Sequence, residues 1–143
     1  MTTADEMHMR AALAEAAAAE RAGEVPIGAV VVAGGEIVAR AHNQPIALHD
    51  PSGHAEILAL RAAGAALANY RLVDAELFVT VEPCLMCVGA IIQARLRRVV
   101  FGCADPKAGA LGGLVDFSTH PGLNHRFSVR GGVCADQAAA LLR

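Results

Sequence analysis

Two short stretches of the chain contain the residues best suited to chemistry. In "PSGHAEILAL", residues 51–60, His54 and Glu56 interrupt an otherwise apolar, helix-forming run. In "VEPCLMCVGA", residues 81–90, Cys84 and Cys87 are three positions apart at the expected start of another helix. An ionisable side chain among apolar neighbours costs stability unless it has a partner. We therefore interpret the two stretches as parts of one site.

Each motif alone has other interpretations. A single histidine on a helix is more often a surface or core residue than a metal ligand. A C-x-x-C pair fits a redox dithiol, half of a zinc knuckle, or two small buried side chains. Together, however, His54, Cys84 and Cys87 supply three ligands, the number that a catalytic zinc ion uses when its fourth position is open to water. Cys103 or Cys134 could in principle close the site, but each lies alone on or beside an apolar element, which favours a buried thiol.

Local electrostatics support the metal site. Pro83 suits the first turn of a helix, which predicts that Cys84 and Cys87 lie in that turn. The positive end of the helix dipole there favours thiolate over thiol. His54 also begins its helix, and two thiolates bring the total charge of zinc and its ligands close to neutral. The prediction is one zinc ion held by His54, Cys84 and Cys87.

Glu56 is predicted to be the catalytic residue. It is two residues from His54, about 200° around an ideal helix, so it should not be an equal metal ligand. From the first turn its longer side chain can reach the water at the metal, where a carboxylate would shuttle protons to the substrate. The alternative, a solvated helix glutamate, would place this carboxylate beside the metal only by chance.

The chain pattern predicts an α/β fold in which these residues meet. Thr3 and Glu6 fit a capping box that opens an alanine-rich helix running to about Gly23. Gly34-Gly35 separates two β-rich runs and predicts a hairpin. The expected elements that follow are a loop over 43–53, a helix over 53–64, a strand in "AELFVTVE", a helix from Pro83 to about Arg95, a strand over 97–103, a glycine-rich stretch over 104–125, a strand near 126–130 and a helix from Ala135.

The β-α-β order predicts parallel strands joined by a right-handed crossover. With the hairpin added, the expected architecture is a three-layer α/β/α sandwich with a mixed sheet of about five strands and helices on both faces. The 143 residues show no internal repeat, linker or composition break, which predicts a single domain over 1–143.

Composition limits the function classes. The chain is 55% hydrophobic and 18% charged, its apolar runs are too short to span a membrane, and it shows no export signal, so a reducing cytoplasm is expected. Its net charge of −2 gives no support for a dedicated nucleic-acid binder. Two local basic clusters are present, for which a solvated helix end is the simpler interpretation. They are Arg95, Arg97 and Arg98, and Lys107, His125 and Arg126.

The pattern His54-Ala55-Glu56 followed by Pro83-Cys84-Leu85-Met86-Cys87 matches the H-x-E…P-C-x-x-C signature of zinc-dependent base and nucleoside deaminases. The similarity extends through "HNQPIALHDPSGHAEILALR", "RRVVFGCADPKAGALGG" and "HPGLNHR". Over nearly its whole length the sequence resembles the bacterial tRNA-specific adenosine deaminases of the cytidine/deoxycytidylate deaminase-like superfamily. The resemblance implies a cytidine-deaminase-like fold, a homodimer, and conversion of the wobble adenosine of a tRNA anticodon loop to inosine.

The same resemblance implies roles for individual residues. His54, Cys84 and Cys87 would bind Zn²⁺, and Glu56 would move protons. Five further positions would contact the substrate, with Asn43 on the flipped base and the loop residues on the RNA-facing rim; they are Asn43, Ala55, Asp105, Lys107 and Asn124. Asn and Asp in Gly- and Pro-rich loops also commonly make turns.

The chain departs from the family pattern in ways that weaken the expected hold on RNA. Gln44 and Leu48 stand where the family often has basic residues, and "ADQAAALLR" ends where the family usually continues with an aromatic and basic tail. One alternative is therefore the same chemistry on a free base or nucleoside, such as guanine, cytosine or cytidine. A second alternative is a non-catalytic module stabilised by zinc, for which Glu56 would be unnecessary.

Overall fold

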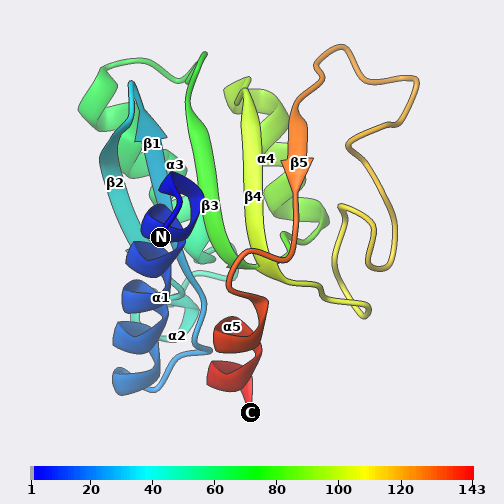
Figure 1. The fold of residues 1–143 in the computed structure, drawn as a ribbon. Helices are drawn as coiled ribbons and strands as arrows, with labels where there is room; N and C mark the ends of the chain where they lie inside the picture. The colour runs from blue at the N-terminus through cyan, green and yellow to red at the C-terminus, as the bar shows by residue number, and fades with distance from the viewer. Residues whose placement is uncertain (1) are drawn as a thin grey trace.

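The computed structural model describes residues 2–143 and has a five-stranded sheet between two layers of helices (Figure 1). The strands are β1 (Gly28–Ala33), β2 (Glu36–His42), β3 (Glu76–Val81), β4 (Arg98–Cys103) and β5 (Ser128–Arg130), in the order β2-β1-β3-β4-β5. The helices are α1 (Ala4–Arg21), α2 (Pro45–Leu48), α3 (Ala55–Leu67), α4 (Leu85–Ala94) and α5 (Ala135–Leu142). The predicted α/β/α sandwich with a mixed sheet is confirmed.

The sheet is mixed because its two halves have different connections. β1 pairs antiparallel with both β2 and β3, whereas β3, β4 and β5 are parallel. Gly34 and Gly35 have φ angles of 60° and 80°, the left-handed conformation that a tight two-residue hairpin turn requires. Parallel strands place their carboxyl ends at one edge, so the segments after β3 and β4 begin next to each other.

Alternating side chains build a separate core on each face of the sheet. Val31, Val79 and Val99 pack with the buried side chains of α3 and α4. Val30, Phe78 and Val100 face the opposite way and pack with α1. Figure 1 shows α1 and α5 in front of the sheet and α3 and α4 behind it. The period-two pattern of the strands thus fixes which helices lie on the side that carries the metal-ligand motifs.

The element boundaries differ from expectation at three places. The expected loop over 43–53 contains the short helix α2, and α3 begins at Ala55 and continues past Gly64 to Leu67. The expected first turn at Pro83 is wrong, because α4 begins at Leu85 with Cys84 as its N-cap. Thr3 is the N-cap as predicted, since its hydroxyl oxygen accepts from the Glu6 N–H at 3.2 Å, but the Glu6 carboxylate accepts from that hydroxyl rather than from the Thr3 N–H, so only half of the predicted capping box is present.

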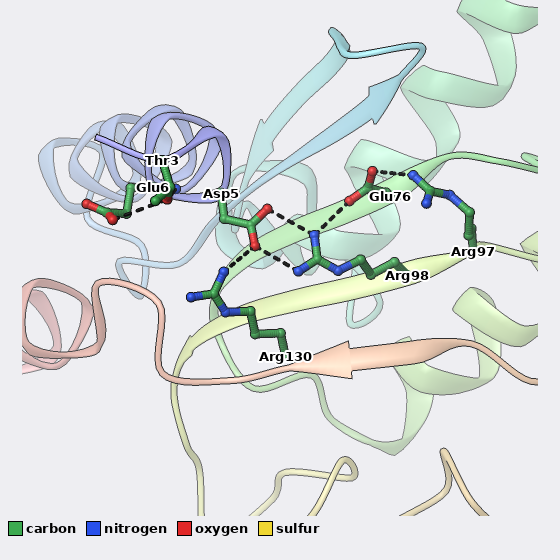
Figure 2. A network of polar contacts seen from close by, with 7 residues as sticks. All are labelled: Thr3, Asp5, Glu6, Glu76, Arg97, Arg98 and Arg130. Carbon is green, nitrogen blue, oxygen red and sulfur yellow. Dashed lines mark hydrogen bonds and ion pairs between the residues drawn. The ribbon is translucent and has the colours of Figure 1, made fainter. Parts of the chain in front are cut away.

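A network of ion pairs joins the start of α1 to the sheet (Figure 2). Arg98 donates to both carboxylate oxygens of Asp5, at 2.9 and 2.7 Å, and to Glu76 at 3.0 Å. Arg130 also donates to Asp5, at 2.6 Å. The hydrogen bonds from Arg98, followed by those from Arg130, outweigh the cost of burial and lower the pKa of Asp5 to about 2. Bidentate pairing of this kind stabilises the contact between α1, β4 and β5.

The same network corrects the interpretation of the first basic cluster. Arg97 donates to Glu76, and Arg98 donates to both Asp5 and Glu76, so these two arginines are paired with acids at the start of α1 and of β3. They are neither a solvated helix end nor a free phosphate-binding patch. Separately, no helix within residues 2–143 is long and apolar enough to cross a membrane.

Candidate metal centre and active site

Two helix N-termini meet at the metal-ligand residues. His54 is the N-cap of α3, Cys84 is the N-cap of α4, and Cys87 lies in the first turn of α4. Both helices pack on the same face of the sheet, where β3 leads directly into the turn that carries Cys84. His54 is thirty residues from Cys84 along the chain, but the α3–α4 packing brings the two side chains together.

The spacing of the three ligand atoms fits zinc. Nδ1 of His54 lies 3.6 Å from Sγ of Cys84 and 3.5 Å from Sγ of Cys87, and the three atoms all lie within 4.8 Å of one another. Bond lengths of about 2.3 Å to sulfur and about 2.0 Å to nitrogen in a tetrahedron give an S···N separation of about 3.5 Å. One imidazole and two thiols are also the donor set of a catalytic zinc with one position left for water.

The two thiols differ in their acidity. The Cys87 thiol hydrogen-bonds to the sulfur of Cys84, which lowers the pKa of Cys84 to about 5 despite its partial burial. That same interaction, followed by burial and the nearby Glu56 carboxyl, raises the pKa of Cys87 above its usual range. Cys84 is therefore a thiolate near neutral pH, and a metal cation would take the place of the proton that the pair shares.

Glu56 lies beside this cluster in a dry environment. Its side chain is only 4% exposed, although it follows the cap residue His54 by two positions. Burial, assisted by the neighbouring charge of Cys84, raises the pKa of the Glu56 carboxyl to about 7. Carboxyl groups tuned toward neutral pH in this way are typical of general acids and bases.

Asn43 and Ala55 form one unit at the start of α3. The Oδ1 atom of Asn43 accepts a hydrogen bond from the backbone N–H of Ala55 at 2.8 Å, and both residues are buried. This bond leaves the Nδ2 group of Asn43 as the donor available to a substrate. The N–H of Ala55 is already used by this bond, which holds the side chain of Asn43 at the start of α3.

The three loop residues proposed for the rim do not lie together. Asp105 is two residues past the carboxyl end of β4, and its Oδ1 accepts from the N–H groups of Lys107 and Ala108 at 3.0 and 3.2 Å. Lys107 is exposed. Asn124 is also exposed, but it precedes His125, whose ring contacts the Leu96 carbonyl near the amino end of β4. Within one chain, Asn124 and Asp105 therefore lie at opposite ends of that strand.

Cys103 and Cys134 are not part of the metal cluster. The expectation that both are buried thiols is wrong, because each is only partly buried: Cys103 ends β4 and Cys134 is the N-cap of α5. The cluster that the described residues form contains His54, Cys84 and Cys87 alone.

Two buried carboxylates escaped the sequence analysis. Glu24 is 6% exposed and accepts from the N–H groups of Ile46 and Ala47, at 3.2 and 2.8 Å, at the start of α2. Glu82 is 4% exposed and accepts three backbone N–H groups from the segment after β4. The only signal for Glu82 is a charged residue at the end of an apolar strand, directly before the Pro83-Cys84 pair.

Comparisons with known proteins agree with this site. Residues 2–103 match the family of the cytidine and deoxycytidylate deaminase zinc-binding region. The tRNA-specific adenosine deaminase of Bacillus subtilis is 45% identical, covering 98% of this chain and 87% of that protein. A solved structure of a tRNA:A34 deaminase superposes with a TM-score of 0.92 at 43% identity, covering 95% of this chain and 99% of the other.

A guanine deaminase from Nitrosomonas europaea is also similar, with a TM-score of 0.85 and 30% identity over 100% of this chain and 84% of that one. Its lower identity separates it from the tRNA-specific relatives, although the fold is shared. The metal-ligand geometry and these similarities lead to one conclusion. The chain belongs to the zinc-dependent deaminase family that includes the bacterial tRNA-specific adenosine deaminases.

Proposed function

We propose that this chain hydrolyses the wobble adenosine of a tRNA anticodon loop to inosine, releasing ammonia, and that residues 1–143 form one deaminase domain for that reaction. The observation that best supports hydrolytic deamination is the buried Glu56 carboxyl beside the His54, Cys84 and Cys87 cluster. The substrate is argued from the relatives, which at 41–45% identity are named tRNA-specific adenosine deaminases.

The metal ligands and Glu56 have separate roles in the proposed reaction. When bound by His54, Cys84 and Cys87, zinc supplies Lewis-acid activation of water. Glu56 would accept the proton that this water loses and donate it to N1 of the adenine as the water oxygen bonds to C6. It would then take the proton of the new C6 hydroxyl and pass it to the amine, which leaves as ammonia when the C6–N bond breaks. The balance is adenosine plus water giving inosine plus ammonia. The dry position of Glu56 keeps its protons from exchanging with bulk solvent.

The substrate contacts that we propose come from the family resemblance, and the hydrogen bonds within the chain are compatible with them. The Nδ2 group of Asn43, held in place through Ala55, donates to the flipped base, while Asp105 shapes the turn that presents Lys107 to the RNA backbone. Asn124 lies at the other end of β4. It would therefore contact either a more distant part of the anticodon stem-loop or, in a dimer, the RNA bound at the other subunit.

A second candidate is deamination of a free base or nucleoside. The guanine deaminase similarity favours it, and so does the net charge of −2, since a small neutral base does not require a basic surface. The two candidates share the zinc chemistry and differ in what Lys107 does. For a free base, this exposed lysine would be irrelevant.

We predict that the purified chain forms inosine in an anticodon stem-loop faster than it releases ammonia from guanine, cytosine or cytidine.

Asn43→Ala should lower turnover at saturating RNA about tenfold or more, because a hydrogen bond in a buried pocket is lost in the transition state. Lys107→Ala should mainly raise the RNA concentration required, and it should reduce the salt slope of binding by about 0.7. Preference for a free base, with Lys107→Ala silent, would exclude tRNA as the substrate.

We also propose a homodimer formed through a groove between α3 and α4. Its walls include Ile57, Leu60, Tyr70, Ala90 and Gln93. Tyr70 is 75% exposed in this groove, and Leu85 at the start of α4, outside the groove, is 57% exposed. Contiguous exposed apolar surface of this kind is typical of protein–protein interfaces. The family resemblance favours a second copy of this chain as the partner that occupies the groove. Sedimentation at micromolar concentration should give twice the chain mass, and monomer mass alone would exclude the dimer.

A cytoplasmic location completes the proposal. The metal site needs reduced thiols at Cys84 and Cys87, and the described cysteines are all free. The substrate that we assign is also a cytoplasmic RNA. Cell fractionation with an antibody against the chain tests this, and recovery in an exported fraction would contradict it.

A further inference from the structure

Glu82 carries a buried charge that the proposed reaction does not use. The side chain is 4% exposed and follows the last residue of β3, two positions before the metal-ligand residue Cys84. Within residues 2–143 it forms no salt bridge, yet a carboxylate removed from water is costly unless it is fully hydrogen-bonded. The hydrogen-bond partners of Glu82 therefore indicate what role it has.

All three partners come from one loop. Oε1 of Glu82 accepts from the Asp105 N–H at 3.0 Å, and Oε2 accepts from the N–H groups of Leu111 and Gly113 at 2.9 and 2.7 Å. Hydrogen bonds to a carboxylate are shorter and stronger than those between neutral groups. A single side chain thus gathers both ends of the 105–113 segment around itself.

The segment leaves no space around this carboxylate. A Cβ atom on Gly109 would lie 2.3 Å from Cδ of Glu82, and one on Gly113 would lie 2.6 Å from Oε1. Neither distance is accessible to a real side chain. The two glycines let the backbone close over Glu82, so the loop and the carboxylate are matched in shape as well as in hydrogen bonding.

The loop that Glu82 holds is also attached to the metal-binding turn. The Ala110 N–H donates to the Pro83 carbonyl at 2.9 Å, and Gly109 forms a β-bridge with Cys84. Asp105 and Lys107 lie at the start of the same segment. Any displacement of the loop would therefore change the position of the predicted substrate contacts relative to the zinc ligands.

We propose that Glu82 is a positioning residue: it fixes the 105–113 segment against the Cys84 turn so that the substrate meets a preformed wall. The substrate identity rests on the function proposed above, whereas the loop anchoring rests on the hydrogen bonds alone. The Glu82 side chain makes its hydrogen bonds to the loop and not to the metal ligands, so its removal should act on substrate binding rather than on zinc.

The Glu82→Gln variant tests this with little change in shape. Its amide oxygen can still accept from Leu111 and Gly113, but its NH₂ group cannot accept from Asp105, so that end of the loop is released. We expect backbone hydrogen exchange at Asp105 to accelerate at least about tenfold, and KM for the substrate that the parent deaminates to rise about tenfold. Zinc content and kcat should change by less than about twofold.

Two further variants separate positioning from general destabilisation. Gly113→Ala would place a Cβ atom 2.2 Å from the Asp105 carbonyl oxygen and 2.6 Å from Oε1 of Glu82, so it disturbs the loop itself and should also accelerate exchange and raise KM. Asp5→Asn weakens the ion network at α1, and it should leave both quantities unchanged.

Unchanged exchange in Glu82→Gln, or faster exchange with unchanged KM, would overturn the proposal, as would an equal KM increase in Asp5→Asn. These outcomes are independent of the tRNA assignment. If the parent deaminates only a free base, the tRNA function fails, and the Glu82 comparison is made with that base.

Discussion

Replacing Glu56 with Ala should lower kcat by about 10²–10⁴-fold, the range that a general acid–base residue typically contributes. The zinc content should stay at about one ion per chain, because the ligands are His54, Cys84 and Cys87 and the Glu56 carboxyl is not one of them. The measurement is single-turnover inosine formation with metal analysis on the same sample. This combination separates loss of proton transfer from loss of the metal.

Glu56→Gln is the matched control for packing. It retains the size of a side chain that is only 4% exposed, so a fall in kcat equal to that of Glu56→Ala would assign the effect to the missing acid–base group. Turnover within tenfold of the parent in either variant would remove Glu56 from the mechanism. The non-catalytic zinc module that the motif alone leaves open predicts a different result, a parent chain that binds zinc and shows no turnover.

The metal cluster could be predicted because residue type and spacing were sufficient. Two thiols three apart at a helix start, and a histidine at the start of another, have few common uses together. The interior place of β3 was expected from its largely apolar sequence, and the parallel β3–β4 pair followed from the chain order. Each of these features is encoded within a few neighbouring residues or by the order of elements.

The features that escaped prediction depend on contacts between distant segments. Arg98 meets Asp5 across 93 positions, and Glu82 meets backbone N–H groups 23 to 31 positions away. A backbone donor carries no signature in the sequence, so a buried glutamate that binds several of them cannot be distinguished from an exposed one. The start of α4 was misplaced by two residues because Pro83 is compatible both with the first turn and with the residue before the cap.

Replacing Cys87 with Ala should remove zinc and activity together. The variant leaves only His54 and Cys84, and two ligands cannot hold a catalytic zinc against dilution or a mild chelator. We expect less than about one tenth of the parent zinc content after dialysis, with inosine formation reduced in the same proportion or more. Atomic absorption and the stem-loop assay on one preparation provide both values.

Cys103→Ala and Cys134→Ala are the matched controls, because they remove the same thiol from partly buried positions outside the cluster. Both should retain the zinc content and the activity of the parent. A two-site alternative, in which Cys103 replaces a lost ligand, predicts that Cys87→Ala keeps its zinc and that only the double variant loses it. Cys103 ends β4 and is not among the ligand atoms that lie within 4.8 Å of one another, so this alternative is not expected. Full zinc occupancy in Cys87→Ala would refute the assignment of Cys87 as a ligand.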